Sequence, residues 1–578
     1  MEYKVKYEQW LNSPIIDEKT KEELKSIASD ENEIEDRFYK DLEFGTGGLR
    51  GIIGAGSNRV NIYTVGKATQ GLANYIVKHG KEAMDRGVAI AYDSRRMSAE
   101  FAERVALIFC GNGIKAYLHS ELQPVPVLSF SVRELGTIAG VTITASHNPP
   151  QYNGYKVYWE DGAQVGLDRA NEIIGEINAV KNFEEIKVMP KEQALEKGLL
   201  TIIGEEVLSK YVDRVVGLSL NPELVKEMGD KMNIIYTPLH GSGNKLVRRV
   251  LDRIGFKNVK VVPEQELPDP NFSTVEYPNP EERRVFELAI GMAREDGNNT
   301  DIILGTDPDC DRVGVVVKNA AGEYVVLTGN QVGALLTNYI LGTLKEKNRL
   351  PENGTVIKTI VTSKMGEKIA KSYGVEVMDT LTGFKFIGEK MGQFEKTGSH
   401  TYLFGYEESY GYLAGDFVRD KDGVSSAMLI CEMAAYYKSK GMSLYEGLVE
   451  LWEKYGYFHE ELKFVEAKGK EGMEQITLLI DELRNNPPKE LAGVKVAVID
   501  DYKESKSYNL VDNSISTIDL PVSDVLRYTM EDESWFAIRP SGTEPKVKLY
   551  FSVVGQSVED AQSTMDKLMK AVGHRIQG

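Results

Sequence analysis

The sequence contains few of the side chains that build disulfide frameworks or zinc sites. Its three cysteines, at positions 110, 310 and 431, include no pair at Cys-x-x-Cys spacing, and its seven histidines show no metal-ligand spacing. These features argue against a disulfide or zinc framework. They favour a reducing compartment, so we expect a cytoplasmic protein.

Long apolar runs and excess positive charge are also missing. No run approaches the ~18–20 apolar residues of a membrane span, and the first eight residues lack the apolar core of a secretory signal. The 69 lysines and arginines are outnumbered by 87 acidic residues, which gives a net charge of −18. We therefore expect no membrane or nucleic-acid partner. An anionic substrate would need a local positive pocket.

The length of 578 residues predicts three to five domains. A strand at 88–92, a helix capped by Ser98 and a strand at 114–118 set a β-α-β rhythm, which restarts near 233 and 354 and implies largely parallel sheets covered by helices. After residue 455 the pattern becomes α+β, with a final helix capped by Ser557, and residues 1–40 predict two surface helices. The predicted domains are 1–205, 206–323, 324–455 and 456–578.

One loop follows the apolar run Val141–Thr144, which predicts a buried strand. It carries Ser146, His147 and, ten residues past the serine, Lys156. A serine that carries a phosphoryl group would need such polar and cationic neighbours. The alternative is a serine that only caps a turn. A serine hydrolase is disfavoured because no Gly-x-Ser-x-Gly elbow surrounds Ser146.

A second loop places Asp307, Asp309 and Asp311 at alternate positions, directly before Arg312. Three carboxylates in one turn can bind a hard cation, and the pattern favours Mg²⁺. Calcium is improbable, because position six is Arg312 and position twelve is Lys318. Two alternatives stay open, namely an aspartate-nucleophile phosphatase, through a DxDx[TV]-like pattern, and a solvated acidic turn.

Two further loops bracket reactive side chains with glycine or proline. Glu407 and Ser409 lie in Gly405–Gly411, which suits vicinal sugar hydroxyls as well as a tight turn with surface glutamates. The segment Arg539–Lys546 offers a guanidinium, two hydroxyls and a loop of N–H groups, which favours a phosphate cradle over a plain hairpin. Near the N-terminus, Gly45–Gly51 lacks the spacing of a dinucleotide fingerprint and instead predicts a turn that presents Arg50 to an anion.

These four loops, in this order, resemble the α-D-phosphohexomutase superfamily, and most closely its phosphoglucomutase branch. The resemblance implies three related mixed α/β domains and a smaller C-terminal α+β lid domain around a central cleft. It implies that Arg50, Lys156 and Arg312 surround the reacting phosphoryl group. It assigns the remaining site residues to the phosphoserine loop (Ser146, His147), the Mg²⁺ site (Ser146, Asp307, Asp309, Asp311), sugar binding (Thr382, Lys385, Glu407, Ser409) and phosphate binding (Arg539, Ser541, Gly542, Thr543, Lys546).

The implied reaction is the reversible conversion of glucose 1-phosphate and glucose 6-phosphate through phospho-Ser146. One Mg²⁺ per chain and glucose 1,6-bisphosphate, as activator and intermediate, are the expected cofactors, and the chain is expected to be a monomer or dimer. Lys156 is the expected general acid/base, helped by His147, with its pKa lowered by burial beside cations. The alternatives are phosphomannomutase or phosphopentomutase activity and, in another class, a non-catalytic sugar-phosphate sensor.

Overall fold

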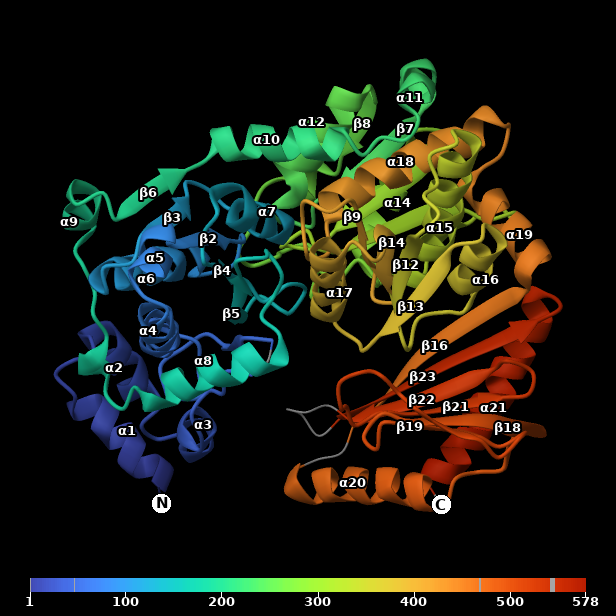
Figure 1. Ribbon diagram of the computed structural model, residues 1–578. Coiled ribbons are helices and arrows are strands. Elements are labelled where there is room, and N and C mark those ends of the chain that lie inside the picture. Colours follow the sequence, from blue (N-terminus) through green and yellow to red (C-terminus); the bar gives the residue numbers. More distant parts are fainter. Residues whose placement is uncertain (1, 46, 467–468, 541–545, 578) are drawn as a thin grey trace. The chain divides into compact units, whose positions relative to one another are not determined.

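The computed structural model describes residues 2–45, 47–466, 469–540 and 546–577 (Figure 1). The chain divides into two compact units. The first unit contains Met1–Gly329 and Phe384–Leu444, and the second contains Asn330–Gly383 and Tyr445–Gly578. Within the described residues, none of the helices combines the length and apolar character needed to cross a bilayer.

Three helices, not the predicted two, form the N-terminal extension of the first unit: α1 (Glu2–Asn12), α2 (Glu18–Ser26) and α3 (Glu31–Phe38). The prediction was wrong because two aspartates start new helices. Asp17 accepts a hydrogen bond from the backbone of Thr20, and Asp30 accepts one from Glu33. The helices share an aromatic core around Trp10 and Phe38.

The first sheet has the order β1-β5-β4-β2-β3-β6. Strands β4, β2, β3 and β6 are parallel, and β5 and β1 are added antiparallel. In β2, Val88 and Ile90 face the core under α4 and α6, whereas Ala89 and Ala91 face α7, as expected for a strand covered on both faces. The strands are β1 (Leu49–Ile52), β2 (Val88–Tyr92), β3 (Ala116–His119), β4 (Ala139–Ile143), β5 (Tyr152–Trp159) and β6 (Leu200–Ile203).

One expected helix cap in this domain is wrong. Helix α6 begins at Ser98, but the capping position is Met97, which makes no side-chain cap. The Ser98 hydroxyl donates to Asp93 Oδ1 instead, at 2.7 Å. The helices around this sheet are α4 (Ile62–Lys78), α5 (Lys81–Arg86), α6 (Ser98–Gly111), α7 (Val125–Leu135), α8 (Leu167–Ala179), η1 (Phe183–Glu185) and α9 (Lys191–Glu196).

The second sheet has the order β11-β10-β9-β7-β8, with β8, β7 and β9 parallel and β10 and β11 antiparallel. Its strands are β7 (Asn233–Thr237), β8 (Asn258–Val261), β9 (Ile302–Thr306), β10 (Val313–Lys318) and β11 (Tyr324–Leu327). Its helices, with their connection to the first sheet, are α10 (Glu205–Val216), α11 (Pro222–Met228), η2 (Gly229–Lys231), α12 (Gly243–Ile254), α13 (Pro263–Glu266), η3 (Arg283–Phe286) and α14 (Glu287–Glu295).

The first unit is completed by α17 (Phe384–Thr397), the hairpin β14 (Thr401–Glu407) and β15 (Gly411–Ala414), and α18 (Gly423–Ser439). Helix α18 is buried along nearly its whole length, and it packs against α12. Asp422 caps its N-terminus by accepting from the backbone of Val424 and Ser425. This cap fixes the residues directly before α18, which reach the site described below.

The second unit contains the parallel pair β12 (Gly354–Thr359) and β13 (Glu376–Thr380), with α15 (Gly329–Glu346), α16 (Met365–Ser372) and α19 (Leu444–Tyr455). Its C-terminal sheet is antiparallel, in the order β16-β23-β22-β21-β18-β19-β20, with β17 paired to β18. The strands are β16 (Tyr457–Glu466), β17 (Glu490–Leu491), β18 (Val494–Asp501), β19 (Lys506–Asn509), β20 (Ile515–Thr517), β21 (Leu526–Met530), β22 (Trp535–Pro540) and β23 (Lys546–Gly555).

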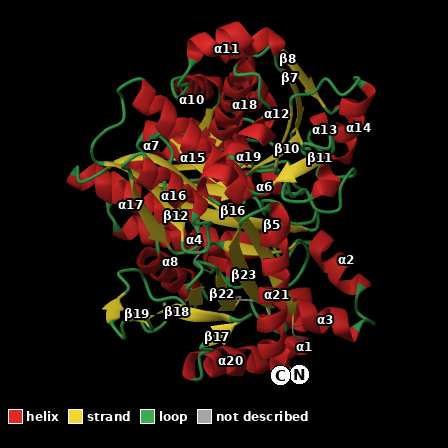
Figure 2. Cartoon of the chain, turned by 90° about the vertical axis from the view of Figure 1, so that its right-hand side faces the viewer, coloured by secondary structure: helices red, strands yellow, loops and turns green. Residues whose placement is uncertain are grey.

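Helices α20 (Gly469–Asn485) and α21 (Val558–Gln577) share one core with this sheet (Figure 2). The Ser557 hydroxyl accepts from the backbone of Asp560, so the predicted cap of the last helix is confirmed. The predicted fold class is also confirmed, with mixed α/β domains followed by a domain built on an antiparallel sheet. The proposed domain boundaries, the central cleft and the lid stay predictions.

Candidate active site

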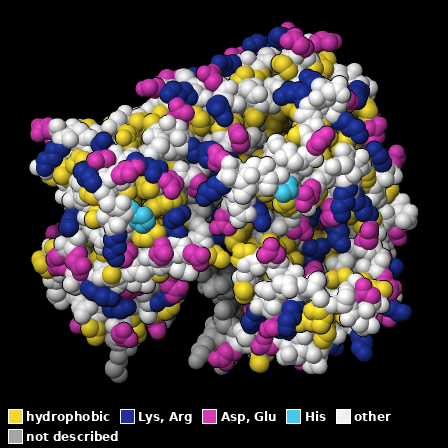
Figure 3. Space-filling model, viewed as in Figure 1, with side chains coloured by type: hydrophobic (Ala, Val, Ile, Leu, Met, Phe, Trp, Pro, Cys, Tyr) yellow, Lys and Arg dark blue, Asp and Glu magenta, His cyan; other side chains and the backbone are white. Residues whose placement is uncertain are grey.

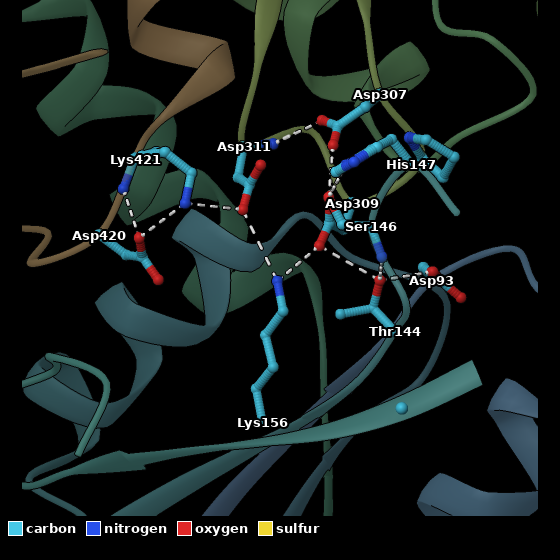
Figure 4. Close-up of polar contacts among 12 residues, drawn as sticks. Asp93, Thr144, Ser146, His147, Lys156, Asp307, Asp309, Asp311, Asp420 and Lys421 are labelled. Carbon is cyan, nitrogen blue, oxygen red and sulfur yellow. Dashed lines mark hydrogen bonds and ion pairs between the residues drawn. The ribbon is translucent and has the colours of Figure 1, made fainter. Parts of the chain in front are cut away.

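Ser146 lies in the loop between β4 and β5, in the first unit (Figure 4). Only 3% of the residue is exposed, and its hydroxyl donates to Asp307 Oδ2 at 2.8 Å, with His147 Nδ1 at 3.1 Å. Strand β5 packs closely against the start of the loop, because a Cβ on Gly154 would lie 2.7 Å from the carbonyl of Thr144. The fold therefore brings the predicted serine onto the acidic loop.

His147 is half-buried beside Ser146. Burial lowers its pKa well below the ordinary value, and the nearby guanidinium groups of Arg312 and Arg50 lower it further. Arg50 Nη1 also donates to Asn148 Oδ1 at 3.0 Å. Both predicted arginines therefore border the serine loop.

The acidic loop lies between β9 and β10, and it brings one carboxylate oxygen each of Asp307, Asp309 and Asp311 within 4.8 Å of one another. Asp307 Oδ1 accepts from the backbone of Asp311 and Arg312. Burial, followed by repulsion from the other two carboxylates, raises the pKa of Asp307 well above its usual range. The turn is thus wound around a cluster of negative charge.

This cluster fits a divalent cation. Asp309 Oδ1 and Asp311 Oδ1 are buried and have no hydrogen-bond partner among the described residues. Orphaned buried carboxylate oxygens are costly without a cation, and a hard cation with oxygen ligands is the group that would satisfy them. The donor set therefore suits Mg²⁺, with Asp307, Asp309 and Asp311 as ligands beside the Ser146 hydroxyl.

Two ammonium groups lie against the same carboxylates. Lys156 Nζ is 2.9 Å from Asp309 Oδ2 and 3.6 Å from Asp311 Oδ2, and Lys421 Nζ is 3.1 Å from Asp311 Oδ2 (Figure 4). Burial acts to raise the pKa of Asp311, but Lys421, Lys156 and Arg312 outweigh it and lower that pKa. Asp311 is therefore held as a carboxylate.

The expected lowering of the Lys156 pKa is wrong for this arrangement. Burial would lower that pKa, but attraction to Asp309 and Asp311 outweighs burial, and the pKa is raised. The same balance raises the pKa of Lys421, whose carboxylate neighbours are Asp311, Asp420 and Glu407. The sequence predicted cations around Lys156, whereas its nearest charges in the fold are anions.

The β14–β15 hairpin brings the predicted sugar loop to the acidic loop. Glu407 is buried at the end of β14, and Ser409 is half-buried in the turn. The backbone N–H of Val313, at the start of β10, donates to the carbonyl of Tyr410 at 3.1 Å. The negative charge of Glu407 also contributes to the raised pKa of both Arg312 and Lys421.

The other predicted residues lie elsewhere or outside the described residues. Lys385 is half-buried in the first turn of α17. Thr382 and Arg539 belong to the second unit, where Thr382 Oγ1 is buried and Arg539 is half-buried near the end of β22. Ser541, Gly542 and Thr543 fall outside the described residues, as does the side chain of Lys546.

Several residues at the site were missed by the sequence-based prediction. Lys421 contacts Asp311, and Glu281 pairs with Arg312. Asp93 and Arg95 lie behind the serine loop. Asp93 and Arg95 directly follow the buried strand β2, which is parallel to β4; the signal that pointed to Ser146, polar residues at the carboxyl end of a buried strand, would also have found them.

A buried hydroxyl beside three clustered carboxylates and several cationic side chains, on sheets with parallel strands, is the arrangement expected of a phosphoryl-transfer enzyme. The sequence matches four successive family descriptions: "Phosphoglucomutase/phosphomannomutase, alpha/beta/alpha domain I" over residues 41–184, domain II over 209–322, domain III over 328–455 and "C-terminal domain" over 480–570. The chain belongs to the phosphoglucomutase/phosphomannomutase family. It is a phosphohexomutase, an isomerase of carbohydrate metabolism that acts by phosphoryl transfer.

Relatives match over nearly the full length. The phosphoglucomutase of Staphylococcus haemolyticus is 39% identical over 524 residues, 90% of this chain and 91% of the relative. That of Staphylococcus aureus strain USA300 is 35% identical over 552 residues, 94% and 96% of the two chains. The fold is similar to Paramecium pp63/parafusin, a phosphoglucomutase (TM-score 0.70, 18% identity, 93% and 95% covered), and to a Burkholderia thailandensis protein of the same family (TM-score 0.66, 18% identity, 93% and 98% covered).

Proposed function

We propose that this phosphohexomutase interconverts glucose 1-phosphate and glucose 6-phosphate, with Ser146 as the phosphoryl carrier. The observation that carries the role of Ser146 is its buried hydroxyl, 2.8 Å from Asp307 Oδ2, in a carboxylate cluster where two oxygens have no hydrogen-bond partner among the described residues. The glucose preference is supported by the relatives named phosphoglucomutase, at 35–39% identity over most of the chain.

In the proposed reaction, phospho-Ser146 transfers its phosphoryl group to the free hydroxyl of glucose 1-phosphate. The resulting glucose 1,6-bisphosphate reorients within the site, so that its two phosphoryl groups exchange positions, and then returns its other phosphoryl group to Ser146. The transition state of such a transfer is loose and highly anionic, so positioning and charge stabilisation dominate. Mg²⁺ held by Asp307, Asp309 and Asp311 would supply positive charge at the phosphoryl oxygens.

The chain's own residues would divide the remaining work. Arg50 and Arg312 border the serine loop and would stabilise the phosphoryl oxygens. Lys156 and His147 are the proposed proton-transfer groups, because one touches the metal carboxylates and the other touches the Ser146 hydroxyl. We propose that the sugar hydroxyls bind Glu407 and Ser409, with Lys385 and Thr382, and that the non-reacting phosphate binds Arg539, Ser541, Gly542, Thr543 and Lys546.

The substrate is tested by one coupled assay. Glucose, mannose and ribose 1-phosphates are compared at trace levels of the matching bisphosphate, and kcat/KM is measured for each. We expect a preference for glucose of at least about tenfold, since one mispaired hydroxyl in a polar site costs about 1–3 kcal/mol. An equal or higher kcat/KM for the mannose or ribose compound would reassign the enzyme as a phosphomannomutase or phosphopentomutase.

Removing the Ser146 hydroxyl tests the carrier. Ser146→Ala should abolish turnover and remove protein-bound phosphate, measured by intact-protein mass spectrometry after incubation with glucose 1,6-bisphosphate. Ser131→Ala is the matched control, because Ser131 is also buried but donates to the backbone of Val127 in α7. Phosphate found on Asp309 in place of Ser146 would favour an aspartate nucleophile.

The remaining assignments belong to the same proposal. We propose the domains 1–205, 206–323, 324–455 and 456–578, arranged around one cleft with the last as a lid. We also propose a cytoplasmic enzyme, a monomer or dimer, with one Mg²⁺ per chain. Support comes from the order of the four loops along the chain, one in each proposed domain.

A further inference from the structure

The guanidinium of Arg95 donates hydrogen bonds to the backbone of the serine loop. Its Nη2 donates to the carbonyls of Ser146 and Asn148, each at 2.5 Å. Its Nη1 donates to the carbonyls of Pro149 at 2.8 Å and Tyr152 at 3.1 Å. One side chain therefore binds four backbone carbonyls of a loop that is more than fifty residues away in sequence, and the Arg95 side chain is fully buried.

Asp93 holds this guanidinium and also reaches Ser146 by a second route. Its Oδ2 lies 3.2 Å from Arg95 Nε, and its Oδ1 accepts from the Arg95 backbone at 2.9 Å. The same Oδ2 is 2.6 Å from Thr144 Oγ1, which accepts from the Ser146 N–H at 2.8 Å (Figure 4). Asp93 thus supports Ser146 through both an arginine and a threonine.

The hydroxyl of Thr144 has one proton and two carboxylate neighbours. Asp93 Oδ2 is at 2.6 Å and Asp309 Oδ2 at 3.2 Å, so the shorter contact takes the proton. Thr144 therefore does not compete strongly for Asp309, which remains available to Lys156 and to a metal ion. The hydrogen bonds that fix the serine loop therefore leave the Asp309 carboxylate free to serve as a proposed metal ligand.

The loop needs this support because Ser146 has a strained backbone. Its φ is +52°, in the left-handed region that residues with a side chain rarely adopt. Such a conformation is unfavourable and persists only where its surroundings hold it. The ring of Phe272, 4.9 Å from the Arg95 guanidinium carbon, covers the guanidinium and keeps the anchoring contacts dry.

We propose that Asp93, Arg95 and Thr144 form a loop anchor that positions the Ser146 hydroxyl for phosphoryl transfer. The proposal rests on the proposed role of Ser146 as phosphoryl carrier. None of the three side chains is assigned to substrate or to the reacting atoms, so they are positioning residues. The anchor acts on kcat, because it fixes where the hydroxyl lies relative to the acidic loop.

The chemistry of the anchor requires arginine. Guanidinium presents five N–H donors in one rigid plane, whereas ammonium presents three on a flexible stem. Lysine at position 95 would keep the charge beside Asp93 but could not span four carbonyls. Arg95→Lys therefore separates geometry from charge.

The first test compares Arg95→Lys with the wild type. We expect kcat to fall about 100-fold, the cost of a misplacement of about 1 Å, with KM changed less than about threefold, since ground-state binding uses other residues. Arg59→Lys is the matched control, because Arg59 is 4% exposed, pairs with Asp36 and donates to two backbone carbonyls. Unchanged kcat in Arg95→Lys, or a loss equal to that of Arg59→Lys, overturns the proposal.

Chemical rescue gives a readout that a purely structural role would not move. Arg95→Ala should lose activity and regain at least about tenfold in kcat when free guanidinium refills the space beside Asp93. Ammonium at the same concentration and ionic strength should not restore it. Rescue by both ions, or by neither, in a folded Arg95→Ala enzyme contradicts a geometric anchor.

A third variant decides the matter if the Arg95 variants do not fold. Thr144→Val keeps the side-chain shape and removes the hydroxyl between Ser146 N–H and Asp93. The rate of Ser146 phosphorylation by glucose 1,6-bisphosphate in a single turnover should fall at least about tenfold, the effect of one lost positioning bond of ~1.5 kcal/mol. A wild-type rate overturns the anchor. Ser146→Ala is measured in parallel, and if it keeps activity the carrier role fails first.

Discussion

At the scale of single residues, three loops of the first unit each contain a non-glycine residue with a left-handed backbone. These are Ser146 in the serine loop, Cys310 in the acidic loop and Tyr410 in the β14–β15 turn, with φ values of +52°, +52° and +65°. Residues of this kind cluster where a structure holds side chains in place for chemistry. The same three loops contact one another, Ser146 through Asp307 and Tyr410 through Val313.

Asp309→Asn tests the metal site at this scale. The change removes one negative charge from the cation site and weakens the hold on Lys156, while the side chain keeps its size. We expect Mg²⁺ affinity to fall at least about 100-fold, since even supporting partners of a ligand cost 10–100-fold. Titration of activity and calorimetry with Mg²⁺ measure it. Asp230→Asn, at an exposed position, is the control, and unchanged affinity in Asp309→Asn would remove Asp309 from the site.

The sequence predicted individual site residues well where their type and local spacing carry the chemistry. Ser146, His147, Lys156 and the three aspartates are such residues, and the fold brings them together. Lys421 and Glu281 could not be found this way, because an ammonium or carboxylate has no local signal until folding sets it against a partner far away in the chain. The sign of the Lys156 pKa shift failed for the same reason.

At the scale of helices and strands, the N-terminal extension is held by an aromatic core. The Trp10 ring lies edge-on to Phe38, Tyr63 and Phe183, with centroid distances of 5.7, 5.5 and 5.5 Å. Only 7% of Trp10 is exposed. The extension therefore packs as part of the first unit, although the family match begins at residue 41.

Trp10→Ala should destabilise the first unit by about 3–5 kcal/mol, the usual cost of deleting a buried aromatic ring. Denaturant unfolding measures the loss, and Trp10→Phe, which keeps a ring, should lose clearly less. We expect kcat and KM, measured well below the unfolding midpoint, to stay near wild-type values because Trp10 packs on other aromatic rings. A large drop in kcat would instead connect the extension to the chemistry.

Strand β16 of the second unit gives a pH-dependent prediction. Burial raises the pKa of the Glu460 carboxyl from 4.5 to about 7, against hydrogen bonds from Ser363 and Ser552 that lower it. The folded chain thus holds the proton more tightly than the unfolded chain, so stability is highest below the unfolded pKa and is lost as pH rises to about 7.

Glu460→Gln removes this penalty because glutamine stays neutral. At a pH of about 8 the variant should be more stable than the wild type by about 1–3 kcal/mol, and the gain should shrink towards a pH of about 5. Thermal midpoints across this range measure it. Glu490→Gln, at an exposed position on β17, should show no such trend, and a pH-independent effect of Glu460→Gln would contradict the assignment.

The helices and strands were predicted from the alternation of strand-like and helix-like segments and from capping residues. The errors of this prediction concern single helix ends. Ser98 precedes an apolar helical run, which predicts a helix cap. In the fold its hydroxyl instead donates a hydrogen bond to Asp93, which follows strand β2. The extension was read as two helices because Asp17 and Asp30 stand among many other charged residues, where a capping aspartate does not differ from a surface one.

At the scale of the whole molecule, the chain is acidic, yet its charges are mixed. On the face drawn in Figure 3, Lys and Arg side chains are interspersed with Asp and Glu. Many are paired, as in Lys210 with Glu134 and Arg253 with Asp213. The proposed Mg²⁺ ligands all belong to the first unit, whereas the predicted phosphate loop belongs to the second.

Mg²⁺ should therefore stabilise the two units unequally. A ligand at 100 times its dissociation constant stabilises its own site by about 2.7 kcal/mol. Hydrogen exchange followed by mass spectrometry should slow in β4, β9 and β10 when Mg²⁺ is added and stay the same in β18. Asp309→Asn should abolish the difference. Equal protection of β18 would indicate a second metal site outside the acidic loop.

The two lysines that contact the acidic loop should affect how the enzyme responds to removal of Mg²⁺. Lys156 and Lys421 are built-in counter-ions: they already balance part of the negative charge that a divalent cation would otherwise have to neutralise. Chelation should then switch the enzyme off without unraveling it, and returning the cation should restore full turnover. Under the proposed Mg²⁺ dependence, the enzyme would stay folded while inactive, and its activity would follow the concentration of free Mg²⁺.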